Sequence, residues 1–239
     1  MIDIVQPTIR FTLISLCLLC EGFARAQNVP APSLEQRLQT MQHTMAISQE
    51  QLHTYQWIET TTFTIDGSAK QPKQSLCHYG PDGHLSKSPV GEVQTVQPSG
   101  GLLKQHIIKK KTEEFKADLA QIAGLTASYL PLNQEQFQSA LHTRRVDLER
   151  DGATGTSIIV NDYVKPGDKV RITFNPQTLQ IQQITIQTYF NAPTDTLKAE
   201  VHFSELNDKT VFPSLTSVAA LARKISITTV ESDFSKPAL

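Results

Sequence analysis

The chain has 239 residues, a formal net charge of −1 and hydrophobic residues at 39% of its positions. A near-neutral chain gives no case for a nucleic-acid-binding protein, whose affinity depends on neutralising phosphates with clustered basic groups. The length suffices for one domain built around a single hydrophobic core.

Residues 1–26 are predicted to be a signal peptide that is cleaved after Ala26. An apolar core of ten residues from Phe11 to Cys20 follows Arg10. Small residues at Ala24 and Ala26 fit the cleavage pattern of an exported protein. A membrane-spanning helix needs roughly 20 apolar residues, so an uncleaved anchor is the less favoured alternative.

The three cysteines also bear on the compartment. Cys17 and Cys20 lie in the signal, and leucine precedes each where a lipoprotein signal would carry a small residue. Only Cys77 remains after cleavage, so an intramolecular disulfide cannot form. We therefore expect a soluble periplasmic or secreted protein that is stabilised by packing.

The first predicted element of residues 27–239 is an amphipathic helix over residues 33–50, with Ser33 as its N-cap. Apolar residues recur in steps of three, four and seven from Leu34 to Tyr55 and form one stripe. We expect this stripe to pack on the protein's own sheet. A coiled-coil partner is the alternative use of such a stripe.

Residues 54–87 are predicted to form a three-stranded meander. Aromatic and β-branched residues alternate from Tyr55 to Ile65, and Asp66-Gly67 then turns the chain. The second and third strands are expected at 74–79 and 84–87, separated by a Pro-Asp-Gly turn.

The middle of the chain, residues 102–142, is predicted to be a helical lid. The preceding residues 88–101 are rich in Pro and Gly without apolar periodicity, as in a surface loop. We expect the end of this loop, Pro98 to Gly101, to be the hinge of the lid. A long helix is expected over 102–130 because Pro131 ends the helical spacing. Asn133, with Gln three residues later, predicts a capped short helix.

Residues 146–234 are predicted to form a second antiparallel meander of roughly seven strands. Apolar residues alternate with polar ones in short runs, so one face of the sheet should be buried. Turn residues such as Lys165-Pro166-Gly167-Asp168 separate the runs. Segregated helices and antiparallel strands indicate an α+β fold.

The sequence contains no catalytic motif that we can identify, so we do not expect an enzyme. Cys77, His78 and His84 are spaced so that their side chains should diverge, and zinc needs three or four converging ligands. We therefore expect no metal and no cofactor. The basic run 109–111 precedes acidic residues at four-residue spacing, which favours an exposed helix face over a membrane-binding patch.

Glu59 is the one carboxylate that stands out, because it lies between Trp57 and Thr61 on the aromatic face of the first strand. A buried carboxylate must be paired or have a shifted pKa, and that can mark a functional site. We favour a purely structural role over a functional site: Glu59 would lie at the edge of the sheet or pair with an Arg.

The order of elements resembles the bacterial lipoprotein-carrier (LolA-like) superfamily, in a single domain spanning residues 27–239. Two phrases carry the resemblance locally: the run 175–184 and the ending 213–234. The stretches 55–60, 79–83 and 162–168 are also similar to uncharacterised secreted bacterial proteins. The resemblance implies a curved antiparallel sheet of about 10–11 strands, an incomplete barrel that a few helices close over an apolar cavity.

A cavity of this kind would bind a lipid or another apolar ligand without needing a sequence motif, and the protein would then act as a carrier. The alternative is an envelope protein–protein interaction module with a filled core. We expect a monomer with transient membrane or envelope-protein contacts. The candidate ligand-binding residues are apolar side chains on the sheet and the lid: Trp57, Phe63, Leu103, Ile107, Phe115, Leu119, Ile122, Val201 and Phe203.

Overall fold

The structure, a computed structural model, describes residues 33–91, 102–151 and 155–237, without the side chains of 102–109 and 151. All of these residues belong to the compact unit Ser33–Leu239. The predicted signal peptide with its cleavage site and most of the predicted loop 88–101, including its hinge, lie outside the described residues.

The strands form one antiparallel sheet of 11 strands that curves but does not close, with β4 and β5 at its edges. Neighbouring strands follow the order β4-β3-β1-β11-β10-β9-β8-β7-β6-β5, and β2 pairs only with β1. The strands are β1 (Gln56–Ile65), β2 (Ser68–Ala69), β3 (Lys73–Tyr79), β4 (Leu85–Pro89), β5 (Val146–Asp151), β6 (Gly155–Asn161), β7 (Lys169–Phe174), β8 (Ile181–Tyr189), β9 (Thr196–Glu205), β10 (Val211–Ala220) and β11 (Ile225–Ser235).

This sheet confirms the predicted α+β class and the seven strands of the second meander. The first meander has a short additional strand, β2, because Asp66 and Gly67 form a two-residue turn in which Ile65 pairs with Ser68. Both turn residues have positive φ angles, 50° and 76°, as a tight hairpin turn between twisted strands requires. The two meanders join where β1 pairs with β11.

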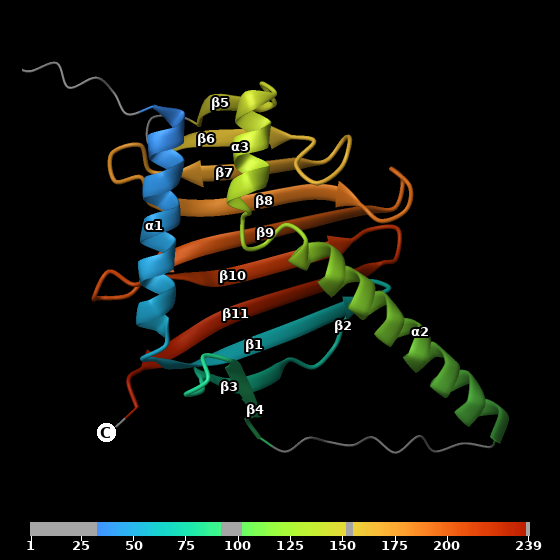
Figure 1. Ribbon diagram of the computed structural model, residues 1–239. Coiled ribbons are helices and arrows are strands. Elements are labelled where there is room, and N and C mark those ends of the chain that lie inside the picture. Colours follow the sequence, from blue (N-terminus) through green and yellow to red (C-terminus); the bar gives the residue numbers. More distant parts are fainter. Residues whose placement is uncertain (1–32, 92–101, 152–154, 238–239) are drawn as a thin grey trace, which may run out of the picture. The chain divides into compact units, whose positions relative to one another are not determined.

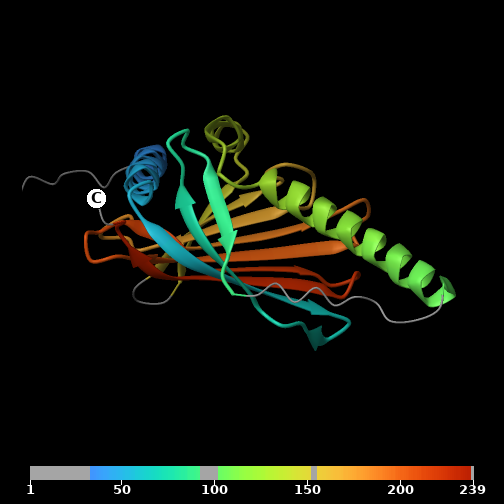
Figure 2. The ribbon, with the colours of Figure 1, turned by 90° about the horizontal axis from the view of Figure 1, so that it is seen from below.

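Three helices lie on one face of the sheet: α1 (Leu34–Leu52), α2 (Leu102–Ala127) and α3 (Gln134–His142) (Figures 1 and 2). Figure 2 shows that the β3–β4 hairpin also turns toward this side, which we call the inner face. Ser33 caps α1 through a capping box with Gln36. The side chain of Asn133 caps α3 by accepting a hydrogen bond from the Gln136 N–H.

The helix boundaries differ slightly from the prediction. The first helix continues to Leu52, beyond the predicted end at residue 50. The long helix ends at Ala127 and not at residue 130, because Leu130 precedes Pro131, where the helical conformation is disfavoured. Residues 128–133 therefore form a junction between α2 and α3 that crosses the inner face.

The core lies between the inner face and the helices, as the alternation of apolar residues predicted. Inward-facing side chains of the central strands β6–β9 are buried, and the stripe of α1 packs on them through Leu38 and Met41. The predicted inward positions that are buried in these strands are Ile158, Val160, Val170, Ile172, Phe174, Ile184, Ile186, Leu197, Ala199 and Val201.

Candidate functional site

The helices do not fill the inner face completely, and the hollows that the described residues leave beneath them include a larger and a smaller one. The larger hollow, with a volume of about 800 Å³, lies between α1, α3, the α2–α3 junction and strands β7–β10. This volume is within the range of about 300–1,000 Å³ that is typical of small-molecule sites. Its lining consists of Leu38, Met41, Gln42, Met45, Ala46, Gln49, Leu130, Pro131, Leu132, Gln134, Phe137, Ile172, Ile181, Ile184, Val201, Phe203, Pro213 and Thr216.

The lining of the larger hollow is mostly apolar, and its polar groups are uncharged. They are the amides of Gln42, Gln49 and Gln134 and the hydroxyl of Thr216. Gln49 donates a hydrogen bond from Nε2 to the hydroxyl of Tyr79, at 2.6 Å. Among the described side chains, no Asp, Glu, Lys, Arg or His lines this hollow.

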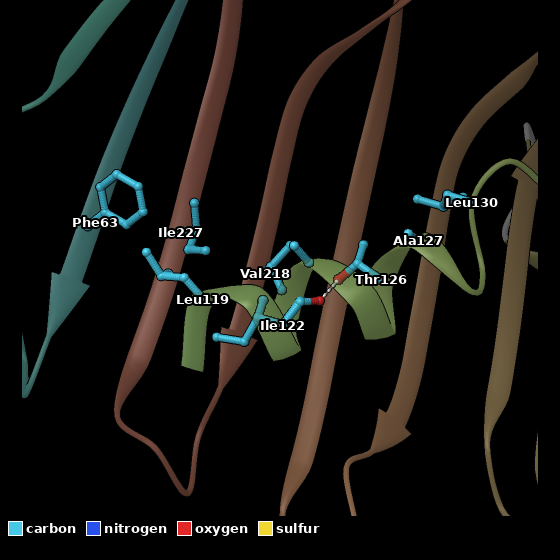
Figure 3. A pocket seen from close by; sticks show the side chains of 9 residues that line it. Phe63, Leu119, Ile122, Thr126, Ala127, Leu130, Val218 and Ile227 are labelled. Atoms are coloured by element: carbon cyan, nitrogen blue, oxygen red, sulfur yellow. Dashed lines mark hydrogen bonds between the residues drawn. The ribbon is translucent and has the colours of Figure 1, made fainter. Parts of the chain in front are cut away.

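The smaller hollow, with a volume of about 480 Å³, lies between the second half of α2 and strands β1, β10 and β11. Figure 3 shows Phe63 and Leu130 at its two ends, with Ile227 and Val218 on the sheet between them. The remaining lining comes from α2: Leu119, Ile122, Ala123, Thr126 and Ala127. The only polar side chain among these residues, Thr126, donates its hydroxyl hydrogen to the carbonyl of Ile122, at 2.9 Å.

A buried hydrogen-bond network holds the α2–α3 junction on the sheet. The hydroxyl of Tyr129 donates to the carboxylate of Asp168, at 2.5 Å, and lies 2.7 Å from the hydroxyl of Thr188. Asp168 also accepts hydrogen bonds from the backbone N–H groups of Tyr163, Val164 and Lys165. Asp168 is only 2% exposed, but these donors replace the hydrogen bonds to water that its carboxylate loses on burial. The network can therefore hold the junction in place without leaving a buried charge unpaired.

A second set of polar contacts connects α2 to the β10–β11 turn of the sheet. The guanidinium of Arg223, in the β10–β11 turn, donates to Asp118 and Gln121 of α2 at 2.9 and 2.8 Å. It also donates to Asp195 at 3.0 Å and lies 3.7 Å from the ring centroid of Phe190. The side chain of Arg223 is only 13% exposed, which makes charge-assisted bonds of this kind stronger than surface pairs.

Beyond the smaller hollow, the inner face of β1 and β11 becomes polar. Phe63 pairs with Ile227, Thr61 with Thr229, and Glu59 with Glu231, so the apolar pair is followed by a threonine pair and then by two carboxylates. Lys87 of β4 reaches across β3 to Glu59, with 2.5 Å between Nζ and Oε2. The structural explanation of Glu59 is therefore an ion pair, although with a lysine and not with the expected Arg.

Glu231 makes no hydrogen bond or ion pair with any side chain that the structure describes. Burial and, to a smaller extent, the neighbouring charge of Glu59 raise the pKa of its carboxyl to about 7, although Lys87 opposes the increase. Two carboxylates directly opposite each other on one face of a sheet repel, so the proton is held more tightly.

Most of the described candidate residues line the hollows, although they divide between the two. Phe63, Leu119 and Ile122 line the smaller hollow, whereas Val201 and Phe203 line the larger one. Phe115 packs edge-on against Phe63, with 6.2 Å between ring centroids. The side chains of Leu103 and Ile107 lie outside the described residues.

Trp57 is placed differently from the other candidates. Its ring is 4% exposed and stacks on Phe234, with 5.6 Å between ring centroids and 13° between planes. Tyr79 and Phe212 complete this aromatic cluster. Trp57 lines neither hollow and therefore contributes to packing beneath the end of α1.

Sequence reasoning missed the contribution of α1 and of the α2–α3 junction to the larger hollow. The apolar stripe of α1, with Leu38, Met41 and Met45, is visible in the sequence, but it predicts packing on the sheet or a coiled-coil partner and not the wall of a hollow. The signal for Leu130 was weaker, because a single leucine before a proline in a connecting segment has no periodic neighbours. Leu130 is the described residue that lines both hollows.

Neither a cluster of potential metal ligands nor a membrane-spanning helix occurs in the described ranges. No three His, Cys, Asp or Glu side chains of these ranges are placed as a metal site would need. None of the described helices is long and apolar enough to cross a membrane. Cys77 is fully buried in β3, as predicted for a structural strand residue.

No protein-family model and no curated protein matches the chain. Among solved structures, it is similar to the LolA superfamily protein NE2245 from Nitrosomonas europaea, with 10% identity and a TM-score of 0.40, covering 83% of this chain and 94% of that one. It is also similar to a DUF1329 family protein from Desulfovibrio piger, with 9% identity and a TM-score of 0.36, covering 83% and 93%. Neither similarity extends beyond the general arrangement of sheet and helices, so the function has to be argued from this chain's own side chains.

Proposed function

We propose that this chain binds an apolar ligand, such as the acyl chain of a lipid, in the larger hollow. The observation that supports the proposal is a hollow of about 800 Å³ lined by apolar side chains and uncharged amides. Each buried methylene contributes about 0.8 kcal/mol, so one acyl chain can be held without a charged anchor. The proposal involves no catalytic step.

The same hollow favours ligand binding over the interaction module, which would need a filled inner face. Large exposed hydrophobic side chains do occur, but they lie on different elements, such as Ile47 on α1, Leu148 on β5 and Leu221 in the β10–β11 turn. Scattered hydrophobic side chains of this kind are normal on a soluble protein surface and do not indicate an interface.

We also propose that the chain acts after export, as a periplasmic or envelope protein that carries its ligand. The predicted signal peptide supports export, and a cavity on the inner face would shield an apolar ligand from water. Monomeric behaviour and only transient membrane or envelope-protein contacts are part of this proposal.

Binding of the fluorescent probe N-phenylnaphthylamine, with competition by phospholipid, tests the proposed function. Ala46 is exposed on α1 and lines the larger hollow, so Ala46→Trp should fill the hollow without disturbing the core. We expect it to weaken probe binding at least about tenfold, a loss of about 1.4 kcal/mol. Ile47→Trp, at a 46% exposed neighbour outside the hollow, is the matched control and should bind like the wild type.

Native mass spectrometry of the purified protein supplies a second measurement, because a co-purified lipid would be displaced in Ala46→Trp and retained in Ile47→Trp. Equal probe binding by both variants and the wild type would contradict the proposed site.

A further inference from the structure

The two hollows meet at one residue. On β10, Thr216 contributes to the floor of the larger hollow and Val218 to that of the smaller one. These residues are two positions apart and therefore face the same side of the strand. Among the described residues, Leu130 is the one whose side chain lines both hollows, and it therefore lies at this boundary.

The hollows differ in chemistry. The smaller one offers only hydrocarbon, because the hydroxyl of Thr126 is already bonded to the carbonyl of Ile122. The larger one carries the amides of Gln42 and Gln134, which can donate to a neutral carbonyl oxygen. None of the described side chains that line either hollow carries a charge that would select an ionised head group.

The chain next to Leu130 is held on the sheet by buried contacts. The preceding residue, Tyr129, is fully buried and is bonded to Asp168 and Thr188. A side chain at a boundary can select ligands only if its backbone does not move aside. The buried network provides that restraint for Leu130.

We propose that Leu130 determines how long an acyl chain the protein accepts. The ligand would be an acyl chain joined through an uncharged ester or amide, with this linkage at Gln42 and Gln134. The tail crosses the larger hollow, passes Leu130 and ends in the smaller hollow. This inference rests on the proposed function, since it requires the larger hollow to bind an acyl chain.

Monoacylglycerols with octanoyl, dodecanoyl and hexadecanoyl chains provide the test, because they carry an ester and no charge. Their affinities are measured by displacement of N-phenylnaphthylamine. For the wild type, affinity should rise by up to about fourfold per added methylene through the whole series. The increase should continue after the larger hollow is full, because the tail enters the smaller one.

Ala123→Phe blocks only the smaller hollow, where Ala123 is an exposed lining residue of α2. The variant should bind the octanoyl ligand like the wild type and lose most of the further gain from dodecanoyl to hexadecanoyl. Leu130→Trp should stop the gain in the same way by narrowing the boundary. Ala120→Phe, at an exposed position of α2 outside the hollow, is the matched control and should follow the wild-type series.

The outcomes separate this inference from the proposed function. If Ala123→Phe reproduces the wild-type series, or weakens all three ligands equally while circular dichroism shows a native fold, the role of the smaller hollow and of Leu130 is overturned and ligand binding stands. If no monoacylglycerol displaces the probe from the wild type, both proposals fail. A Leu130→Trp variant that does not fold leaves the decision to Ala123→Phe.

Discussion

The raised pKa of Glu231 makes protein stability depend on pH in an unusual direction. Most carboxylates in folded proteins are stabilised in the ionised form, so that acid weakens the fold. Glu231 faces Glu59 across the β1–β11 pair, and the other charged group near it is Lys87, which is bonded to Glu59. Burial and this repulsion raise its pKa to about 7, from an ordinary value of 4.5.

The magnitude follows from the linkage between protonation and folding. Above the unfolded-state pKa, the unfolded chain releases the proton of Glu231 while the folded chain retains it, so the free energy of unfolding falls as the pH rises. The loss begins near the unfolded value and is complete above about pH 7. Each pKa unit corresponds to about 1.4 kcal/mol, so the total is on the order of 3 kcal/mol.

Glu231→Gln tests this reasoning, because glutamine resembles the protonated carboxyl. We expect the variant to be more stable than the wild type by about 3 kcal/mol near about pH 8, and by less than about 1 kcal/mol near about pH 5, where most of the loss has not yet occurred. Urea unfolding gives these values, with the emission of the single tryptophan, Trp57, as the signal. Comparing variant with wild type at each pH cancels the titration of other groups.

Two further variants sharpen the test. Lys87→Met removes the positive charge that opposes the increase, so it should raise the pKa of Glu231 further and steepen the loss of stability. Glu50→Gln, at an exposed position of α1, should leave the pH profile unchanged. If the stability difference between Glu231→Gln and the wild type is the same near about pH 5 and about pH 8, the proposed effect of burial and repulsion is refuted.

Four other predictions can be measured on the same protein. Cys77→Ser should cost about 1–2 kcal/mol without changing the fold or the ligand content, and zinc analysis should find no stoichiometric metal in the wild type. Arg223→Ala should cost about 2 kcal/mol and speed hydrogen exchange in residues 110–127, which Arg223→Lys should partly prevent. Trp57→Phe should cost about 1–2 kcal/mol, because the smaller ring leaves part of the buried aromatic cluster unfilled while no hydrogen bond of the indole N–H to a described residue is lost. The intact mass of the exported protein should match cleavage after Ala26, and a lipid adduct on either signal cysteine would contradict it.

Features that depend on local sequence were predicted well. The alternation in the second meander identified its buried face, since neighbouring side chains of a strand must point to opposite sides. The Asp66-Gly67 turn and the Ser33 cap follow from residues whose backbone preferences are strong on their own. The end of the long helix was predicted less accurately, because Pro131 disfavours the helical conformation at Leu130 and residues 128–133 form the junction instead.

The division of the apolar residues between two hollows could not be predicted. Phe63 and Val201 look alike in the sequence, as apolar positions of alternating strands, yet they line different hollows. The difference arises from where α2 crosses the sheet, and two long-range contacts fix that crossing: Tyr129 with Asp168, and Arg223 with Asp118. No local pattern encodes such pairs.

The pairing of Glu59 with Glu231, and the pKa shift that it causes, could not be predicted from the sequence either. Glu59 stands out in the sequence because of its aromatic neighbours, whereas Glu231 lies in a polar stretch where nothing distinguishes it. Their relation comes from the register of β1 with β11, which joins two segments far apart in the chain. Shifting this register by one residue would move one carboxylate to the outer face. The raised pKa of Glu231 is therefore a property of the sheet, and a measured pH profile reports on the register as directly as on the residue.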